Sequence, residues 1–177
     1  MNSLYKKLHL PVSGSDLRKI PLNWSEFDYI ARKLLSDIQR SGVKFDVVIG
    51  NARGGLPLAV FLAHHLGIGT NNFGAIKVQR HSGDTIESQL LKPLISGSFF
   101  PVIKGKRVLL VEDTIGTQMA SLKVIVKNLR LQTPKEVYAV AMFVGAIDTR
   151  FVPIVYFHKN ADSSQRQWVI FPWEVNN

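Results

Sequence analysis

The sequence predicts an α/β fold in which a mainly parallel sheet is flanked by helices. Short apolar runs alternate with helical patterns along most of the chain, as parallel strands alternate with crossover helices. Two of the strand-to-helix junctions, at 51–55 and 114–117, are turns rich in small residues. Because ligands gather at the carboxyl ends of parallel strands, we expect both turns to lie at one edge of the sheet.

The composition is that of one globular domain. The 177 residues, 46% hydrophobic and 20% charged, suffice for a single α/β domain with a substantial core. No apolar run approaches the roughly 18 residues of a membrane span, and the amino terminus lacks the apolar core of a signal peptide. The chain has no cysteine, which fits a cytoplasmic setting. We expect residues 1–22 to form an N-terminal arm and residues 23–177 a single domain.

The formal net charge of +9 points to an anionic partner. That partner is either a phosphorylated small molecule or nucleic acid. The basic residues are scattered without a long basic block, which favours the small molecule and keeps nucleic acid as the alternative.

The first elements form a scaffold. Residues 24–41 are predicted to form an amphipathic helix with Ser25 as its N-cap, because six apolar residues recur at helical spacing. These are Phe27, Ile30, Ala31, Leu34, Leu35 and Ile38. A short strand over 45–50 and a buried helix over 56–66 follow, and 73–79 alternates as a further strand.

The turn Asn51-Ala52-Arg53-Gly54-Gly55 joins that first strand to its helix. Two glycines let backbone N–H groups approach a ligand closely, and the Arg53 guanidinium can bind phosphate oxygens with two donors. A Gly-Gly turn can also be a plain tight connection. Anion binding is favoured because a second turn of the same plan occurs later in the chain.

That second turn follows the apolar strand 108–112. Two acids, Glu112 and Asp113, precede a loop over 114–117, and a helix begins after it. A helix amino terminus offers unpaired N–H groups to a phosphate. Paired carboxylates can hold ribose hydroxyls or a magnesium ion, although they can also be plain solvent-facing charges.

The remaining segments complete the sheet and its surroundings. Strands are predicted over 136–144 and 152–157, while 81–101 has weak periodicity and is typical of a functional lid or a disordered connection. The tail is aromatic, with Trp168, Phe171 and Trp173, a pattern typical of core filling. The histidines show no metal-binding spacing.

Three stretches resemble the type I phosphoribosyltransferases in that family's order. RVLLVEDTIGTQMAS at 107–121 resembles the family's signature for 5-phosphoribosyl 1-diphosphate (PRPP), and VVIGNARGGLPLA at 47–59 resembles its pyrophosphate loop. WVIFPWE at 168–174 is similar to the purine-closing segment of bacterial and archaeal hypoxanthine/guanine/xanthine enzymes. The resemblance implies Mg²⁺-assisted transfer of phosphoribose from PRPP to a purine-type nucleobase. Pyrophosphate and a nucleoside monophosphate would be the products of a cytoplasmic, homodimeric enzyme of purine salvage.

The resemblance also implies site residues. Glu112 and Asp113 would hold the ribose hydroxyls and Mg²⁺, and with Arg53 would be catalytic. The 5′-phosphate would lie among Thr114, Ile115, Gly116, Thr117, Gln118 and Met119. Pyrophosphate would be bound by Ala52, Arg53, Gly54 and Gly55, with a cis Ala52–Arg53 peptide. The base would meet Trp168, Val169 and Ile170. A small flap or hood from the central loop and the C-terminal tail would close the site, with Arg80, His81 and Lys92 as flap residues.

Four positions depart from the family pattern. Gly116 stands where the PRPP signature has a third acid that handles the proton of the base, and Gln118 and Ala120 replace its glycine and threonine. Gly145 replaces the lysine that purine enzymes direct at the base. A missing general base lowers a rate by about 10²–10⁴ and leaves PRPP binding possible. The alternative function is therefore a catalytically reduced PRPP- or nucleotide-binding protein, acting as a sensor, a regulator or a module associated with nucleic acid or protein.

Overall fold

The computed structural model describes residues 18–79, 92–94, 100–116, 118–145, 150–159 and 167–174. Its helices are α2 (Trp24–Arg40), α3 (Leu56–His65), the short 3₁₀ helix η1 (Thr70–Asn72) and α4 (Ala120–Leu131). Its strands are β1 (Arg18–Pro21), β2 (Val47–Asn51), β3 (Phe73–Gln79), β4 (Lys92–Leu94), β5 (Arg107–Ile115), β6 (Glu136–Val144), β7 (Ile154–Lys159) and β8 (Gln167–Ile170).

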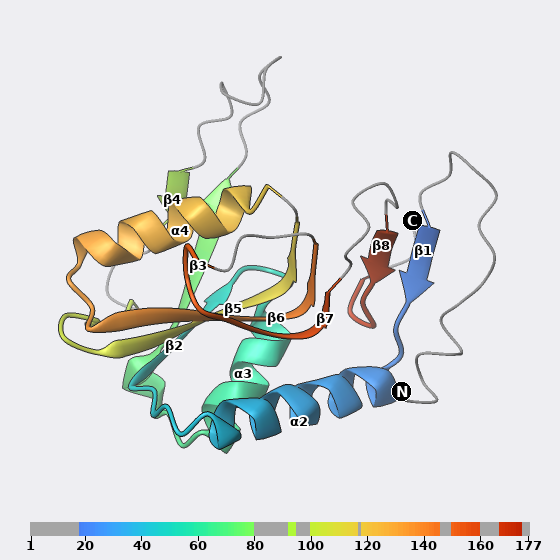
Figure 1. The fold of residues 1–177 in the computed structure, drawn as a ribbon, viewed down its shortest axis with the longest axis horizontal. Coiled ribbons are helices and arrows are strands. Elements are labelled where there is room, and N and C mark those ends of the chain that lie inside the picture. The colour runs from blue at the N-terminus through green and yellow to red at the C-terminus, as the bar shows by residue number, and fades with distance from the viewer. Residues whose placement is uncertain are drawn as a thin grey trace, which may run out of the picture.

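Six strands form one sheet in the order β4-β3-β2-β5-β6-β7 (Figure 1). Every neighbouring pair is parallel except β3 with β4, which is antiparallel at the edge. The predicted mainly parallel α/β sheet is thus confirmed. β2 and β5 are direct neighbours, with Gly50 opposite Val111, so the turns that follow them start at one edge of the sheet.

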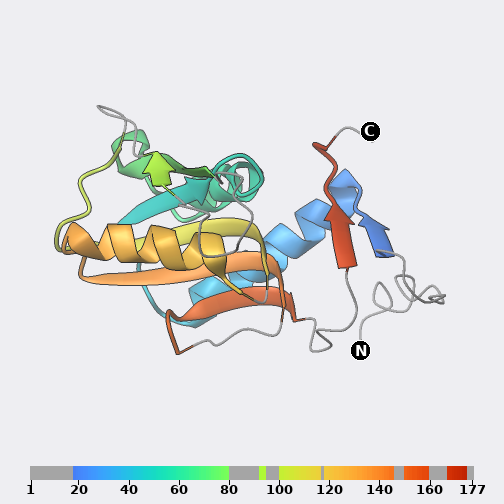
Figure 2. The ribbon, with the colours of Figure 1, turned by 90° about the horizontal axis from the view of Figure 1, so that it is seen from above.

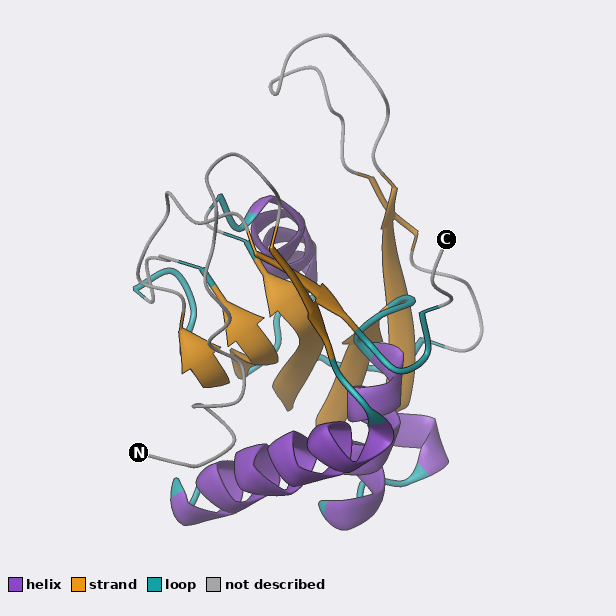
Figure 3. Cartoon of the chain, turned by 90° about the vertical axis from the view of Figure 1, so that its right-hand side faces the viewer, coloured by secondary structure: helices purple, strands orange, loops and turns teal. Residues whose placement is uncertain are grey.

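Helices cover both faces of the sheet, as expected for crossover connections (Figure 1, Figure 3). Alternate residues of β2 point to opposite faces: Val47 and Ile49 pack in the cluster with α4, and Val48 packs with α2 and α3. All three side chains are fully buried. No helix among the described residues is long and apolar enough to span a membrane.

The amino terminus of α2 corrects one prediction. The N-cap is Asn23 and not Ser25, because the Asn23 side chain accepts the Glu26 N–H at 2.9 Å. The Glu26 carboxylate accepts the Asn23 N–H at 2.8 Å in return. This reciprocal capping box fixes the helix start two residues earlier than the hydroxyl of Ser25 would.

Several predicted boundaries move by one or two residues. The predicted strand over 45–50 is β2 at 47–51, since Phe45 lies before the ladder and packs edge-on against Tyr138 at 5.3 Å between centroids. The predicted strand over 152–157 begins only at Ile154, because Pro153 has no N–H to donate. The helix predicted over 56–66 ends at His65.

A separate two-stranded parallel sheet pairs β1 with β8 (Figure 2). It joins the N-terminal arm to the C-terminal tail, and the Leu22 N–H donates to the Ile170 carbonyl at 2.8 Å. The described part of the hood is therefore built from the two ends of the chain, whereas the sequence suggested the central loop and the tail. The arm before residue 18 and most of 81–101 lie outside the described residues.

Candidate functional site

The two turns expected to bind phosphates meet at the carboxyl edge of the sheet. The Asp113 carboxylate lies directly against Gly54, so that a β-carbon at position 54 would overlap it. Gly55 is equally confined, because a β-carbon there would overlap the Val111 carbonyl and lie 2.9 Å from the Asn51 carbonyl. The Ala52–Arg53 peptide is cis, as the resemblance implied. Glycine is thus required at 55, where backbone atoms are in the way, and at 54 any side chain would displace the Asp113 carboxylate.

Strand β5 runs further than predicted. It continues through Asp113 and Thr114 to Ile115, and Thr114 and Ile115 lie opposite Phe143 and Val144 of β6. The Ile115 side chain is 3% exposed and belongs to the core, while Thr114 is exposed. Ile115 therefore belongs to the core directly beneath the edge of the site.

Glu112 lies on β5 directly before Asp113, and its carboxyl is buried, with the residue 4% exposed. Its Oε2 accepts a hydrogen bond of 2.8 Å from the Asn51 side-chain amide, while its Oε1 and the Asn51 Oδ1 are buried without a partner. Burial raises the pKa of Glu112 to about 8; the Asn51 hydrogen bond opposes this rise and the Asp113 charge adds to it. A buried polar atom without a hydrogen-bond partner is costly, and an unpaired carboxyl oxygen at this position is suited to a ligand or metal.

Asp113 is the more open acid. Its Oδ1 accepts the Thr114 N–H at 2.6 Å. Burial raises the pKa of Asp113, and the negative charge of Glu174 in the C-terminal tail raises it further, against the backbone hydrogen bonds. Glu174 is itself held in a turn, where its Oε2 accepts the Phe171 N–H at 2.9 Å. The C-terminal tail therefore places a third acidic side chain near the acid pair.

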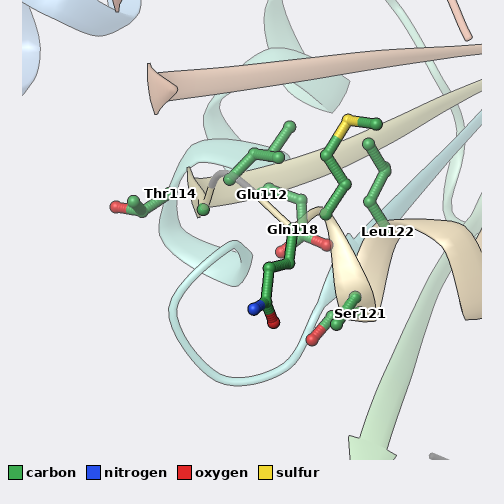
Figure 4. Close-up of a pocket in the computed structure, with 9 residues that line it drawn as sticks. Glu112, Thr114, Gln118, Ser121 and Leu122 are labelled. Atoms are coloured by element: carbon green, nitrogen blue, oxygen red, sulfur yellow. The ribbon is translucent and has the colours of Figure 1, made fainter. Parts of the chain in front are cut away.

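A hollow of about 230 Å³ lies between Glu112 and the start of α4. It is lined by Glu112, Thr114, Ile115, Gly116, Gln118, Met119, Ala120, Ser121 and Leu122. Figure 4 shows Gln118 and Ser121 extending in the same direction from the start of α4. Both Gln118 and Gly116 line the hollow; Gln118 is exposed, and a β-carbon added at Gly116 would meet nothing within 4 Å.

Met119 corrects the proposed phosphate cradle. It is the N-cap of α4 in the left-handed conformation, with φ of 50°, and its side chain is 5% exposed in the core. Its N–H already donates to the Gly116 carbonyl at 2.9 Å and is not available to a ligand. The first turn of α4, from Ala120 to Leu122, has the unpaired N–H groups that a helix start provides.

The structure describes only some of the other predicted site residues. Arg53 is exposed at the turn and Ala52 is partly buried there, with its N–H donating to the Ile76 carbonyl at 2.7 Å. Thr117, Arg80 and His81 lie outside the described residues. Lys92 opens β4, opposite Gln79, and its side chain is not described. No flap residue is thus placed against the acid pair.

The tail is packed through aromatic rings. Phe171 and Trp173 stack with centroids 4.7 Å apart and planes at 8°, and Phe171 meets Phe143 of β6 at 6.3 Å. Val169 packs against the same core, and the Trp168 side chain is not described. Gly145 follows β6 and donates its N–H to the Ile115 carbonyl at 2.8 Å. The glycine found at the expected lysine position thus adjoins the edge of the hollow.

The described residues hold no group of three or more His, Cys, Asp or Glu side chains arranged for a metal. Glu112 and Asp113 are two adjacent carboxylates, and Glu112 keeps an unpaired oxygen. Hard oxygen ligands of this kind suit Mg²⁺, which usually takes one or two protein carboxylates and completes its shell with phosphates and water. The residues present therefore fit Mg²⁺ delivered with a phosphorylated ligand.

Three contributors escaped the sequence analysis. Asn51 carries no functional signal in the resemblance, although it ends β2 and directly precedes the Ala52–Arg53 peptide. Ser121 lines the hollow, and a hydroxyl residue in the first turn of a helix was a usable signal. Glu174 acts on Asp113 across more than 60 residues of sequence, and no local pattern could have indicated that.

Comparisons with known proteins agree with this geometry. The phosphoribosyl transferase domain family matches residues 22–176. The transcriptional regulator GfcR 2 of Methanosarcina barkeri is 29% identical over 149 residues, covering 77% of this chain and 70% of that protein. The crystal structure of a purine phosphoribosyltransferase from Pyrococcus horikoshii Ot3 has a TM-score of 0.68 at 29% identity, covering 90% of this chain and 96% of that one. A hypothetical protein from Neisseria gonorrhoeae with bound ppGpp has a TM-score of 0.72 at 19% identity, covering 91% and 92% of the two chains, and shares the fold.

Proposed function

Because this chain belongs to the phosphoribosyltransferase family, we propose that it binds PRPP with Mg²⁺ and transfers the phosphoribose to a purine-type nucleobase, releasing pyrophosphate. The observation that carries the proposal is the contact between Asp113 and Gly54. It joins the turn suited to pyrophosphate to the acids suited to ribose. A cytoplasmic, homodimeric enzyme of purine salvage is part of the same proposal.

In this proposal, different residues bind the pyrophosphate, the ribose and the 5′-phosphate of PRPP. Arg53 and the backbone of Gly54 bind the pyrophosphate, because an exposed guanidinium and bare backbone are good phosphate ligands. The Gly55 N–H donates to the Asn51 carbonyl, so Gly55 contributes by closing the turn. Glu112 and Asp113 hold the ribose hydroxyls, directly or through Mg²⁺. The first turn of α4, with the Ser121 hydroxyl, receives the 5′-phosphate at the helix amino terminus.

In the proposed reaction, the bond between ribose C1 and the pyrophosphate oxygen breaks and a bond from C1 to a base nitrogen forms. Positive charge develops on the ribose and negative charge on the leaving pyrophosphate. When bound, Mg²⁺ supplies electrostatic stabilisation of that negative charge. Arg53 adds a fixed positive charge at the same end. The proton of the base nitrogen passes to water, because position 116 is a glycine and supplies no carboxylate to accept it.

The proposal is tested by measuring pyrophosphate release from PRPP and Mg²⁺ with hypoxanthine, guanine, xanthine and adenine in turn. Base-dependent release, with formation of the matching nucleoside monophosphate, is the expected result. PRPP binding without turnover of any of these bases would reject the transferase and retain the ligand site.

A second function, a sensor or regulator that binds PRPP or a nucleotide, is favoured by two residues. Gly116 offers no carboxylate to the base, and the exposed Gln118 side chain occupies the margin of the hollow. The similarity to a transcriptional regulator over 149 residues is consistent with this reading. If it holds, ligand binding changes the affinity for DNA, RNA or a protein partner. Nucleic-acid binding would weaken steeply as salt rises.

A further inference from the structure

We propose that Asn51 is a positioning residue that fixes the Glu112 carboxyl and couples the pyrophosphate turn to the ribose and metal end of the site. The inference rests on the proposed function and goes beyond it, because Asn51 has no role in the resemblance described above. It follows from one hydrogen bond and two unpaired oxygens.

Asn51 stands at the junction of two elements. It is the last residue of β2 and immediately precedes the Ala52–Arg53 peptide, so its backbone belongs to the pyrophosphate turn. Its carbonyl accepts the Gly55 N–H at 2.9 Å, which closes that turn. Its side-chain amide crosses to β5 and donates to Glu112 Oε2 at 2.8 Å. Asn51 therefore closes the pyrophosphate turn with its carbonyl and holds the Glu112 carboxyl on β5 with its side chain.

The hydrogen bond gives the two Glu112 oxygens different roles. Oε2 is occupied by the Asn51 amide, and Oε1 is left without a partner. With Oε2 held, the carboxyl plane cannot rotate freely, so the direction of Oε1 is fixed before any ligand arrives. Preorganisation of this kind increases affinity because less side-chain freedom is lost on binding.

A purely structural role for Asn51 is disfavoured by its other side-chain atom. Asn51 Oδ1 is buried and has no hydrogen-bond partner. A buried unpaired carbonyl destabilises the folded state, whereas an apolar pair of similar shape at 51 and 112 would be nearly neutral. The polar pair is therefore better explained by the site than by packing between β2 and β5.

The test is a double-mutant cycle on PRPP binding, measured by calorimetry over a series of Mg²⁺ concentrations. Loss of the hydrogen bond to the carboxylate that Glu112 presents when Mg²⁺ is bound predicts that Asn51→Ala weakens Mg²⁺-dependent PRPP binding by about tenfold to a hundredfold. The Mg²⁺ concentration at half-maximal PRPP binding rises as well, which a smaller folded fraction alone would not cause. In a Glu112→Ala background, adding Asn51→Ala changes the affinity by less than about twofold, because the partner is gone.

Asn72→Ala is the matched control. The Asn72 side chain also binds a charged group, accepting from Lys106 Nζ at 2.8 Å, but it ends η1 just before β3, at the opposite end of the strands from the acid pair. It should leave PRPP binding unchanged. Asn51→Ser, which keeps a short hydroxyl donor, is the second variant should Asn51→Ala not fold, and it should recover part of the lost affinity.

Three results overturn the inference. One is PRPP binding by folded Asn51→Ala within about twofold of the parent. Another is tighter PRPP binding by Asn51→Ala, which would show that Asn51 holds Glu112 in an orientation unfavourable for binding. The third is an equal loss with and without Glu112, which would show that Asn51 does not act through it. Failure of the parent protein to bind PRPP is a separate result, which rejects the proposed function and this inference together.

Discussion

The Asp113 carboxylate rests on the backbone of Gly54, the residue that follows Arg53 in the neighbouring turn. This contact is the physical link between two sequence motifs that are almost 60 residues apart. It exists because β2 and β5 are adjacent parallel strands in register, with Gly50 opposite Val111. The turns that follow them are therefore pressed together at one edge of the sheet.

Gly54→Ala is expected to disrupt the site and spare the fold. The added β-carbon would overlap the Asp113 carboxylate, which must then leave its position. We expect PRPP binding to weaken by about tenfold or more, the effect of losing one charge-assisted contact. Calorimetric titration with PRPP and Mg²⁺ measures it.

Gly69→Ala is the control, since a β-carbon at position 69 meets nothing within 4 Å and the glycine has φ of −68°. Unchanged PRPP affinity in Gly54→Ala would contradict the contact between the two turns as described.

The stability of the ligand-free protein should fall as pH rises from about 5 to 8. Burial raises the pKa of Glu112 from its ordinary value of 4.5 to about 8, so the folded state keeps a proton that the unfolded state has released. Stabilisation by this group is complete below the lower value and is lost as pH rises through the upper one. The raised pKa of Asp113 acts in the same direction. Melting temperatures across this range measure the effect.

Glu112→Gln removes the titrating group and keeps a neutral side chain of similar shape. Its melting temperature should therefore decline less between pH 5 and 8 than that of the parent. Equal slopes for the two proteins would show that Glu112 titrates normally in the folded state.

Arg53→Ala should remove affinity for pyrophosphate and leave stability unchanged. Arg53 is exposed, so its truncation costs little folding energy. Loss of a charge-assisted bond to phosphate predicts about a tenfold or greater loss of pyrophosphate binding. Lys44→Ala removes one exposed positive charge before β2, at the other end of that strand. A similar loss in both variants would mean that only net charge matters.

Gly116→Asp should increase transferase activity. Position 116 is exposed and a β-carbon there meets nothing within 4 Å, so the carboxylate can be accommodated. Supplying the missing acid is expected to raise the rate by up to about 10²–10⁴ while PRPP affinity changes little. Pyrophosphate release with each purine base measures the rate. If both forms bind PRPP and neither turns over any base, the sensor or regulator reading replaces the transferase.

The sheet and its helices were largely predictable because their signals are local. The pattern over 73–79 and 136–144 gave β3 and β6 with their observed limits. The limits predicted for α2 agree with the structure to within one residue, but the predicted N-cap was wrong. Asn23 and Ser25 are both good capping residues, and only the Glu26 partner decides between them. The start of β7 is the opposite case, because the sequence contained the signal that decides it. Pro153 has no N–H to donate to a neighbouring strand, so the strand begins only at Ile154.

The site was predictable in its parts but not in its contacts. The resemblance identified both turns and the acid pair. It could not indicate that Met119 turns its side chain into the core and uses its own N–H on Gly116, because that depends on the φ of one residue. The link from Asn51 to Glu112 spans 61 positions and depends on strand order, which local pattern does not contain.

The central claim is that one crevice holds both ends of PRPP, and competition binding tests it most directly. PRPP bound with Mg²⁺ is titrated separately with pyrophosphate and with ribose 5-phosphate, and its displacement is followed by calorimetry. The account predicts one PRPP per chain, displaced by either compound alone. Displacement by only one of them, or no PRPP binding at all, would contradict it.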